Sequence, residues 1–200
     1  MMAYEPARLE ILLTKLAFLL CGKSAYKAFA DCLPLHGAER ALDFGCGMGT
    51  VAYYAAKRLP HGHLTCLDIS TRWLNACRRT LRGYSNISFF HSQAPALLQD
   101  SFDVVYCHFV LHDISASELE TVLPALVKSL KPGGTFIFRE PLKEAEKLSI
   151  IKRLTAQNGL LLKDSRITDV PLMGNALESV YIKTTADHVS CDGVHVHKAR

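Results

Sequence analysis

The fold of this chain is decided by one short stretch, Ala41-Leu42-Asp43-Phe44-Gly45-Cys46-Gly47-Met48-Gly49-Thr50. Its apolar first half predicts a buried strand, and the apolar residues between 52 and 59 recur at helical spacing. The glycines between them predict a tight turn, because glycine accepts positive φ and lets the backbone approach a ligand closely. A helix that starts there presents unpaired N–H groups. The stretch therefore predicts a strand, a turn that holds a small cofactor by its main chain, and a helix.

The spacing of the glycines separates this turn from the dinucleotide fingerprint. Nicotinamide and flavin enzymes carry G-x-G-x-x-G, whereas Gly45, Gly47 and Gly49 alternate, so a nicotinamide-dependent enzyme is a disfavoured alternative. Asp43 is placed to hydrogen-bond the turn or to face a cationic group on the ligand. Further on, a second apolar run ends at Asp68, where a carboxylate can bind both hydroxyls of a ribose. These features predict a cofactor that contains adenosine.

The acid-and-glycine pattern, the second acid and the turn Lys131-Pro132-Gly133-Gly134 resemble the class I S-adenosylmethionine-dependent methyltransferases, in particular their small-molecule, type 11-like members. The resemblance covers about residues 39–183. It implies an α/β fold with a Rossmann-like, seven-stranded, mostly parallel sheet of order 3-2-1-4-5-7-6, flanked by helices. We expect an N-terminal helical segment over 1–38 that covers the pocket, a methyltransferase domain over 39–184 and a polar tail over 185–200.

The resemblance implies S-adenosylmethionine as the cofactor, with contacts around the glycine turn and at the ends of neighbouring strands. The family usually binds the adenine amino group with an acid or amide after the third strand, and here Ser92 or Gln93 supplies the acceptor. Ile69 is expected to flank the adenine, which is compatible with core packing. The expected cofactor-binding residues are Asp43, Gly45, Cys46, Gly47, Gly49, Asp68, Ile69, Ser92, Gln93 and Cys107.

The segment after the predicted fourth strand is expected to border the methyl group, because ligands of open parallel sheets lie at the carboxyl ends of strands. His108 and His112 have the spacing of one helix face, and a histidine of ordinary pKa can take a proton from a hydroxyl at neutral pH. They are therefore the catalytic candidates, with pocket lining as the alternative. A metal is not expected there, since the spacing offers no third ligand. The expected substrate contacts are Phe109, Asp113, Arg139 and Glu140.

Two alternatives stay open for these residues and for the reaction. Arg139 and Glu140 either bind a charged substrate or pair with each other and with the loops. The segment from Cys107 to Val110 is not the Asn/Asp-Pro-Pro-aromatic motif, so methylation of base amines or of glutamine is disfavoured. The predicted reaction is methyl transfer to an O, N or S nucleophile of a small molecule. A non-catalytic protein that binds S-adenosylmethionine or S-adenosylhomocysteine is the alternative, and an RNA methyltransferase is less favoured.

Composition sets the remaining limits. The chain has 200 residues, 49% of them apolar and 21% charged, which suits one α/β domain. Its net charge of +4 is spread along the chain, so a nucleic-acid partner is disfavoured. A monomer or homodimer is expected. The 7 cysteines form no C-x-x-C pair and predict reduced, buried thiols of a cytoplasmic protein. The apolar run from Leu9 to Cys21 is interrupted by Lys15 and is too short to span a membrane, so it predicts an amphipathic helix.

The polar tail carries His188, Cys191, His195 and His197. A zinc clip is an alternative there, but histidines of a tail without a matched second half are more often disordered.

Overall fold

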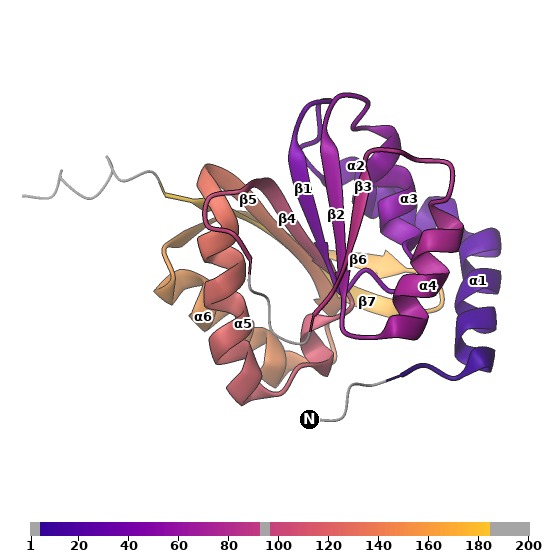
Figure 1. Cartoon of the computed structure of the whole chain (residues 1–200). Coiled ribbons are helices and arrows are strands. Elements are labelled where there is room, and N and C mark those ends of the chain that lie inside the picture. Colours follow the sequence, from indigo (N-terminus) through magenta and orange to yellow (C-terminus); the bar gives the residue numbers. More distant parts are fainter. Residues whose placement is uncertain (1–4, 93–96, 185–200) are drawn as a thin grey trace, which may run out of the picture.

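The computed structural model describes residues 5–92 and 97–184 and contains a seven-stranded sheet (Figure 1). The strand order is β3-β2-β1-β4-β5-β7-β6, which confirms the predicted topology. β1 to β5 run parallel, whereas β7 is antiparallel to both of its neighbours. The strands are β1 (Arg40–Phe44), β2 (His63–Asp68), β3 (Ile87–His91), β4 (Phe102–His108), β5 (Leu130–Pro141), β6 (Leu160–Val170) and β7 (Gly174–Lys183).

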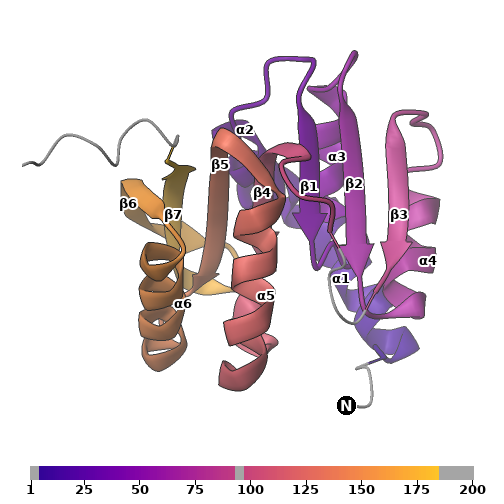
Figure 2. The same cartoon turned by 60° about the vertical axis from the view of Figure 1, so that its left-hand side comes forward.

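Helices cover both faces of the sheet (Figure 2). On one face α5 and α6 pack on Val105, Phe136 and Phe138, and on the other the layer from α1 to α4 packs on Cys66 and Tyr106. The helices are α1 (Arg8–Gly22), α2 (Ala28–Cys32), α3 (Thr50–Lys57), α4 (Thr71–Thr80), α5 (Ala116–Ser129) and α6 (Ala145–Gln157), with a π-helical turn η1 (Lys23–Lys27) and a 3₁₀ turn η2 (Leu111–Asp113).

Polar caps start two of these helices. Ser70 accepts a hydrogen bond from the Trp73 N–H at 3.0 Å, and the capping box of Ser115 with Glu118 begins α5. The first cap places α4 directly after Asp68, and the second begins α5 soon after η2. Both helices therefore start beside strand ends on the same edge of the sheet.

The predicted N-terminal helix is present, but all of its leucines face solvent. Phe18 is the anchor, since its ring contacts the rings of Tyr26, Tyr53 and Tyr54. The leucines that are half or more exposed are Leu9, Leu12, Leu13, Leu16, Leu19 and Leu20. Among the described residues, no helix is long and apolar enough to cross a membrane.

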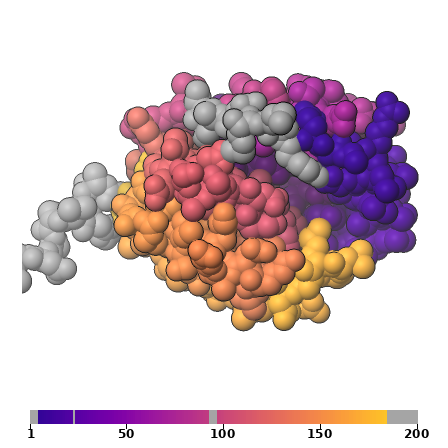
Figure 3. All heavy atoms as spheres, turned by 90° about the horizontal axis from the view of Figure 1, so that it is seen from below, coloured from indigo at the N-terminus to yellow at the C-terminus, as the bar shows by residue number. Residues whose placement is uncertain are grey.

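The carboxyl ends of the parallel strands lie together at one end of the molecule, which Figure 3 views directly. The surface there is hollowed between the N-terminal helices and the segments that follow β4 and β5 (Figure 3). Ligands of open parallel sheets bind at this edge. The glycine turn follows β1 and His108 ends β4, so both reach it.

Candidate active site

The glycine turn is held in place by the end of β2. The N–H groups of Gly45 and Cys46 both donate to the Leu67 carbonyl, at 2.8 and 3.0 Å. The Gly47 N–H donates to Asp68 Oδ2 at 2.8 Å, so the acid predicted for a ribose also fixes the turn. All three glycines have positive φ, +72° at Gly45, +51° at Gly47 and +79° at Gly49, as the alternating pattern predicted.

The three glycines differ in what surrounds them. A Cβ at Gly45 would lie 2.2 Å from Val110 Cγ2, so the turn packs directly on the segment that follows β4. A Cβ at Gly49 would lie 2.7 Å from Cys77 Sγ. A Cβ at Gly47 would meet no described atom within 4 Å, so this part of the turn is open to a ligand.

Two carboxyl groups lie around the turn. Asp68 also accepts from the Ser70 N–H at 2.9 Å, and burial raises its pKa although the N–H donors oppose the shift. Asp43 lies in register with Cys66 and Tyr106, and burial raises the pKa of its carboxyl well above the ordinary value. Asp43 therefore lies beneath the turn, whereas Asp68 lies beside it.

The adenosine side of the expected site is only partly described. Ile69 is 37% exposed, and the Ser92 N–H donates to the Asp68 carbonyl at 3.3 Å, so both lie next to Asp68. Gln93 lies outside the described residues. Sequence reasoning missed Glu5, whose carboxylate accepts from Ser70 Oγ at 2.8 Å and from the Thr71 N–H at 3.0 Å. Glu5 thereby brings the N-terminal segment to the start of α4.

On the expected acceptor side of the site, Glu140 at the end of β5 holds the neighbouring segment in place. Its fully buried carboxylate accepts from the N–H groups of Val110 at 2.9 Å, Leu111 at 2.7 Å and His112 at 3.3 Å. It also contacts His112 Nδ1 at 2.5 Å. Four donors thus converge on one side chain, which fixes both the backbone after β4 and the orientation of the His112 ring.

The two histidines have opposite electrostatic environments. Burial lowers the pKa of His108 to about 3, with the charge of Arg139 acting in the same direction. Burial also acts to lower the pKa of His112, but the hydrogen bond and charge of Glu140 raise it overall. His112 Nε2 lies 3.4 Å from Asp113 Oδ1, so a protonated ring would lie between two carboxylates.

The rings beside these histidines form an aromatic wall. The His108 ring lies 4.9 Å from those of Phe29 and Phe109 and 5.6 Å from that of Tyr26, measured between centroids. Among the described residues, His108 Nε2 has no hydrogen-bond partner. Phe109 has a positive φ of +55°, which is strained for a bulky residue.

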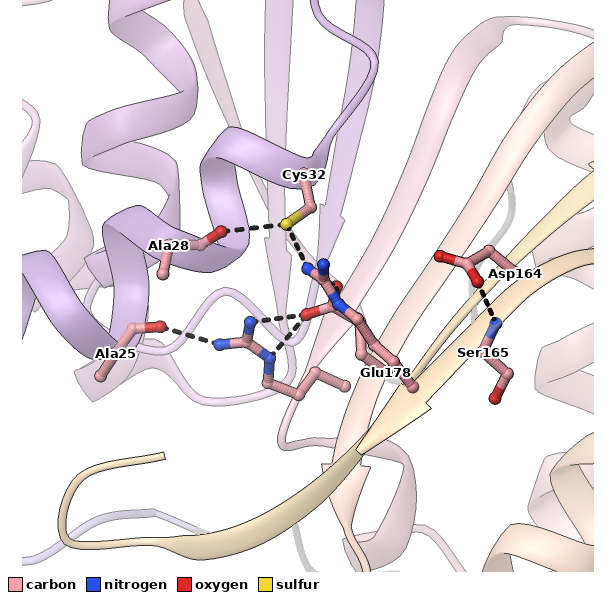
Figure 4. Close-up of polar contacts among 8 residues, drawn as sticks. Ala25, Ala28, Cys32, Asp164, Ser165 and Glu178 are labelled. Atoms are coloured by element: carbon pink, nitrogen blue, oxygen red, sulfur yellow. Dashed lines mark hydrogen bonds and ion pairs between the residues drawn. The ribbon is translucent and has the colours of Figure 1, made fainter. Parts of the chain in front are cut away.

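The remaining predicted substrate and cofactor residues are Arg139, Cys107 and Asp113, and they differ in burial and in their partners. Arg139 is buried and donates to Glu178 at 2.9 and 2.5 Å and to the Ala25 carbonyl at 2.9 Å (Figure 4). Arg139 and Glu140 are therefore paired inside the protein, but with different partners rather than with each other. Cys107 is fully buried on the face that α5 and α6 cover, and the Asp113 side chain is 75% exposed.

Comparisons with known proteins agree with this arrangement. Residues 41–134 match the family described as Methyltransferase domain. A demethylmenaquinone methyltransferase from Clavibacter sepedonicus is 36% identical over 104 residues, which cover 51% of this chain and 41% of the relative. A trans-aconitate 2-methyltransferase from Methylobacterium radiotolerans is 29% identical over 128 residues, which cover 64% of this chain and 47% of the relative. The chain thus spans less than half the length of these two relatives.

A solved structure shows the same fold over most of both chains. A SAM dependent methyltransferase from Aquifex aeolicus has a TM-score of 0.67 at 18% identity, and the match covers 86% of this chain and 96% of that one. At this identity the likeness concerns the fold. The chain therefore has the fold of the class I S-adenosylmethionine-dependent methyltransferases, and its residues 41–134 are similar to the methyltransferase domain family. The family implies S-adenosylmethionine as the cofactor.

Proposed function

We propose that this protein is an enzyme that methylates an oxygen, nitrogen or sulfur nucleophile of a small molecule, with S-adenosylmethionine as the methyl donor. The observation that carries the proposal is the packing of Gly45 on Val110, because it joins the cofactor turn to the segment that holds His112. Glu140 fixes that segment through its backbone and its histidine. The relative that acts on trans-aconitate supports a small acceptor.

The residues around the turn fit an adenosine cofactor with a cationic amino acid end. The open space at Gly47 lets a ligand approach the main chain of the turn, which also includes Gly45, Cys46 and Gly49. We assign Asp68 to the ribose hydroxyls, Asp43 to the cationic end and Ile69 to the adenine. Ser92 lies on that side, and Gln93, outside the described residues, stays a prediction. When bound, S-adenosylmethionine supplies an electrophilic methyl group.

The chain's own residues position the acceptor and take its proton. With Nδ1–H donated to Glu140, the lone pair of His112 Nε2 is available for an acceptor hydroxyl, and Asp113 then stabilises the protonated ring. His108 stays uncharged at neutral pH, so we assign it a hydrogen bond to the acceptor and assign Phe109, whose ring contacts it, to lining the pocket. Orienting the acceptor supplies much of the acceleration in such a transfer.

Calorimetric titration with S-adenosylhomocysteine tests the cofactor site. Asp68→Asn keeps an oxygen for the Gly47 N–H but removes the charge, so we expect binding to weaken by about 1–3 kcal/mol, or roughly 5- to 150-fold. Asp103→Asn is the matched control, because Asp103 bonds the Arg40 N–H and Lys131 at the other end of the strands. Absence of binding by the unmutated protein would refute the proposed cofactor, and equal losses in both variants would refute the role of Asp68.

The pH dependence of stability tests the pairing of His112 with Glu140. The folded pKa of His112 is raised, so its contribution to the free energy of unfolding is full below its unfolded pKa of about 6.5 and is lost as pH rises through the folded pKa. His112→Asn should remove this decline from a series of denaturant titrations. His63→Asn should retain it, because the pKa of His63 is lowered and its effect lies at lower pH. An unchanged decline in His112→Asn would contradict the pairing.

A further inference from the structure

Three buried thiols converge behind the glycine turn. Cys46 belongs to the turn, Cys66 to β2 and Cys77 to α4, and all three are free thiols. Their Sγ atoms lie within 4.8 Å of one another. Cys66 and Cys77 are fully buried and Cys46 is 6% exposed. Segments that are distant in sequence therefore bring three soft ligand atoms together in a place that excludes water.

The backbone is adapted to this cluster. Gly49 makes room for the Cys77 sulfur, because a Cβ at Gly49 would lie 2.7 Å from it. Cys66 projects from β2 into the layer of helices from α1 to α4, where Cys46 and Cys77 also pack. Isolated buried cysteines usually act as small apolar residues, and Cys107 on the other face of the sheet is an example. The three sulfurs of the cluster lie close together, and this distinguishes them from a single buried cysteine that only fills space in the core.

We propose that Cys46, Cys66 and Cys77 form a binding site for one soft, closed-shell cation of the Cu⁺ and Cd²⁺ kind. Thiolate ligands select such cations. Three metal–sulfur bonds of about 2.3 Å in a trigonal arrangement separate the sulfurs by about 4 Å, so the cluster needs to contract by less than about 1 Å. Each thiol that binds releases its proton to solvent as a metal–sulfur bond forms, and no electrons are transferred.

The cation site lies behind the glycine turn, whereas the proposed methyl-transfer site lies in front of it. The turn, which includes Cys46, borders both. A cation there would tie the glycine turn to β2 and α4, the same elements that hold Asp68 and Ser70. Occupation is therefore expected to raise the temperature of unfolding of the full chain.

Titration of the reduced, full-length protein with Cd²⁺ tests the proposal through the ultraviolet charge-transfer band of cadmium thiolates. We expect the band to saturate at one Cd²⁺ per chain, to be reduced to a small fraction in Cys77→Ala and Cys66→Ala, and to be unchanged in Cys107→Ala. Cys191→Ala is a second control, because Cys191 is close in sequence to the tail histidines and is outside the described residues.

Titration of the wild-type protein can refute the proposal even if a cluster variant is unstable. Absence of a band that saturates at one equivalent would overturn it. A band that survives in folded Cys77→Ala and Cys66→Ala, or that is lost in Cys191→Ala, would also overturn it. Circular dichroism of each variant establishes that it is folded, and Cys46→Ala provides a third variant in the turn.

Discussion

Gly45→Ala is expected to destabilise the protein by roughly 2–5 kcal/mol, because a left-handed conformation costs a non-glycine residue about 1–2 kcal/mol and overpacking costs about 1–3 kcal/mol more. Gly45 has φ +72°, and its added Cβ would collide with the Val110 side chain at 2.2 Å. Relief of that collision must move the turn away from the segment that bears His112. Chemical denaturation measures the loss of stability, and titration with S-adenosylhomocysteine measures the accompanying loss of cofactor affinity.

Gly47→Ala is the matched control for Gly45→Ala. Its φ of +51° is also left-handed, but no described atom lies within 4 Å of the added Cβ. We expect a loss of only about 1–2 kcal/mol in stability, together with weaker cofactor binding on the open side of the turn. Equal losses of stability in the two variants would show that packing on Val110 does not distinguish these positions.

Arg139→Leu is expected to have the second large effect, a loss of about 3–5 kcal/mol in the free energy of unfolding. It removes both donors from Oε2 of the buried Glu178 carboxylate, which then keeps only the half-exposed Arg166 on Oε1. Arg139 and Glu178 are 3% and 2% exposed. The substitution also removes the bond to the Ala25 carbonyl and the contact of the guanidinium with the Phe29 ring, at 4.7 Å. The helical segment at the N-terminus therefore loses an attachment to the sheet. Thermal and denaturant unfolding measure the effect.

Two further variants separate charge burial from simple loss of a contact. Arg166 also bonds Glu178, but its side chain is 49% exposed, so Arg166→Leu should cost at most about 1 kcal/mol. The double variant Arg139→Leu/Glu178→Leu should lose less free energy of unfolding than Arg139→Leu alone. It no longer contains the buried carboxylate whose pairing with Arg139 is lost in the single variant. If Arg166→Leu cost as much as Arg139→Leu, the assigned importance of burial would be wrong.

The fold could be predicted because its signals are local. Alternating glycines, Asp68 after an apolar run, and the capping box of Ser115 each report a strand end or helix start within a few residues. The strand order came from the family resemblance, and the structure confirms it. The outward orientation of the leucines in α1 was not predictable in this way, because helical spacing identifies an apolar face without showing what that face contacts.

The candidate site was less accessible to sequence reasoning, because its decisive contacts join distant residues. Glu140 and Arg139 are adjacent in sequence, yet one binds the segment after β4 and the other binds Glu178 on β7. Alternation of side chains along β5 was the available signal that neighbours face opposite sides. The electrostatic difference between His108 and His112 also depends on burial and on Glu140, which spacing cannot report.

The strained backbone at Phe109 lowers the stability of this segment, whereas the ring of Phe109 serves the proposed reaction. A glycine there would relieve strain of about 1–3 kcal/mol from the positive φ, offset by the lost packing of the ring. The same change would remove the aromatic surface between His108 and His112, at 4.9 and 6.3 Å from their rings. We therefore expect Phe109→Gly to unfold at a similar denaturant concentration and yet to be slower in the proposed methyl transfer. Selection for stability alone would therefore not distinguish the two residues at this position, whereas selection for the proposed turnover would retain the ring.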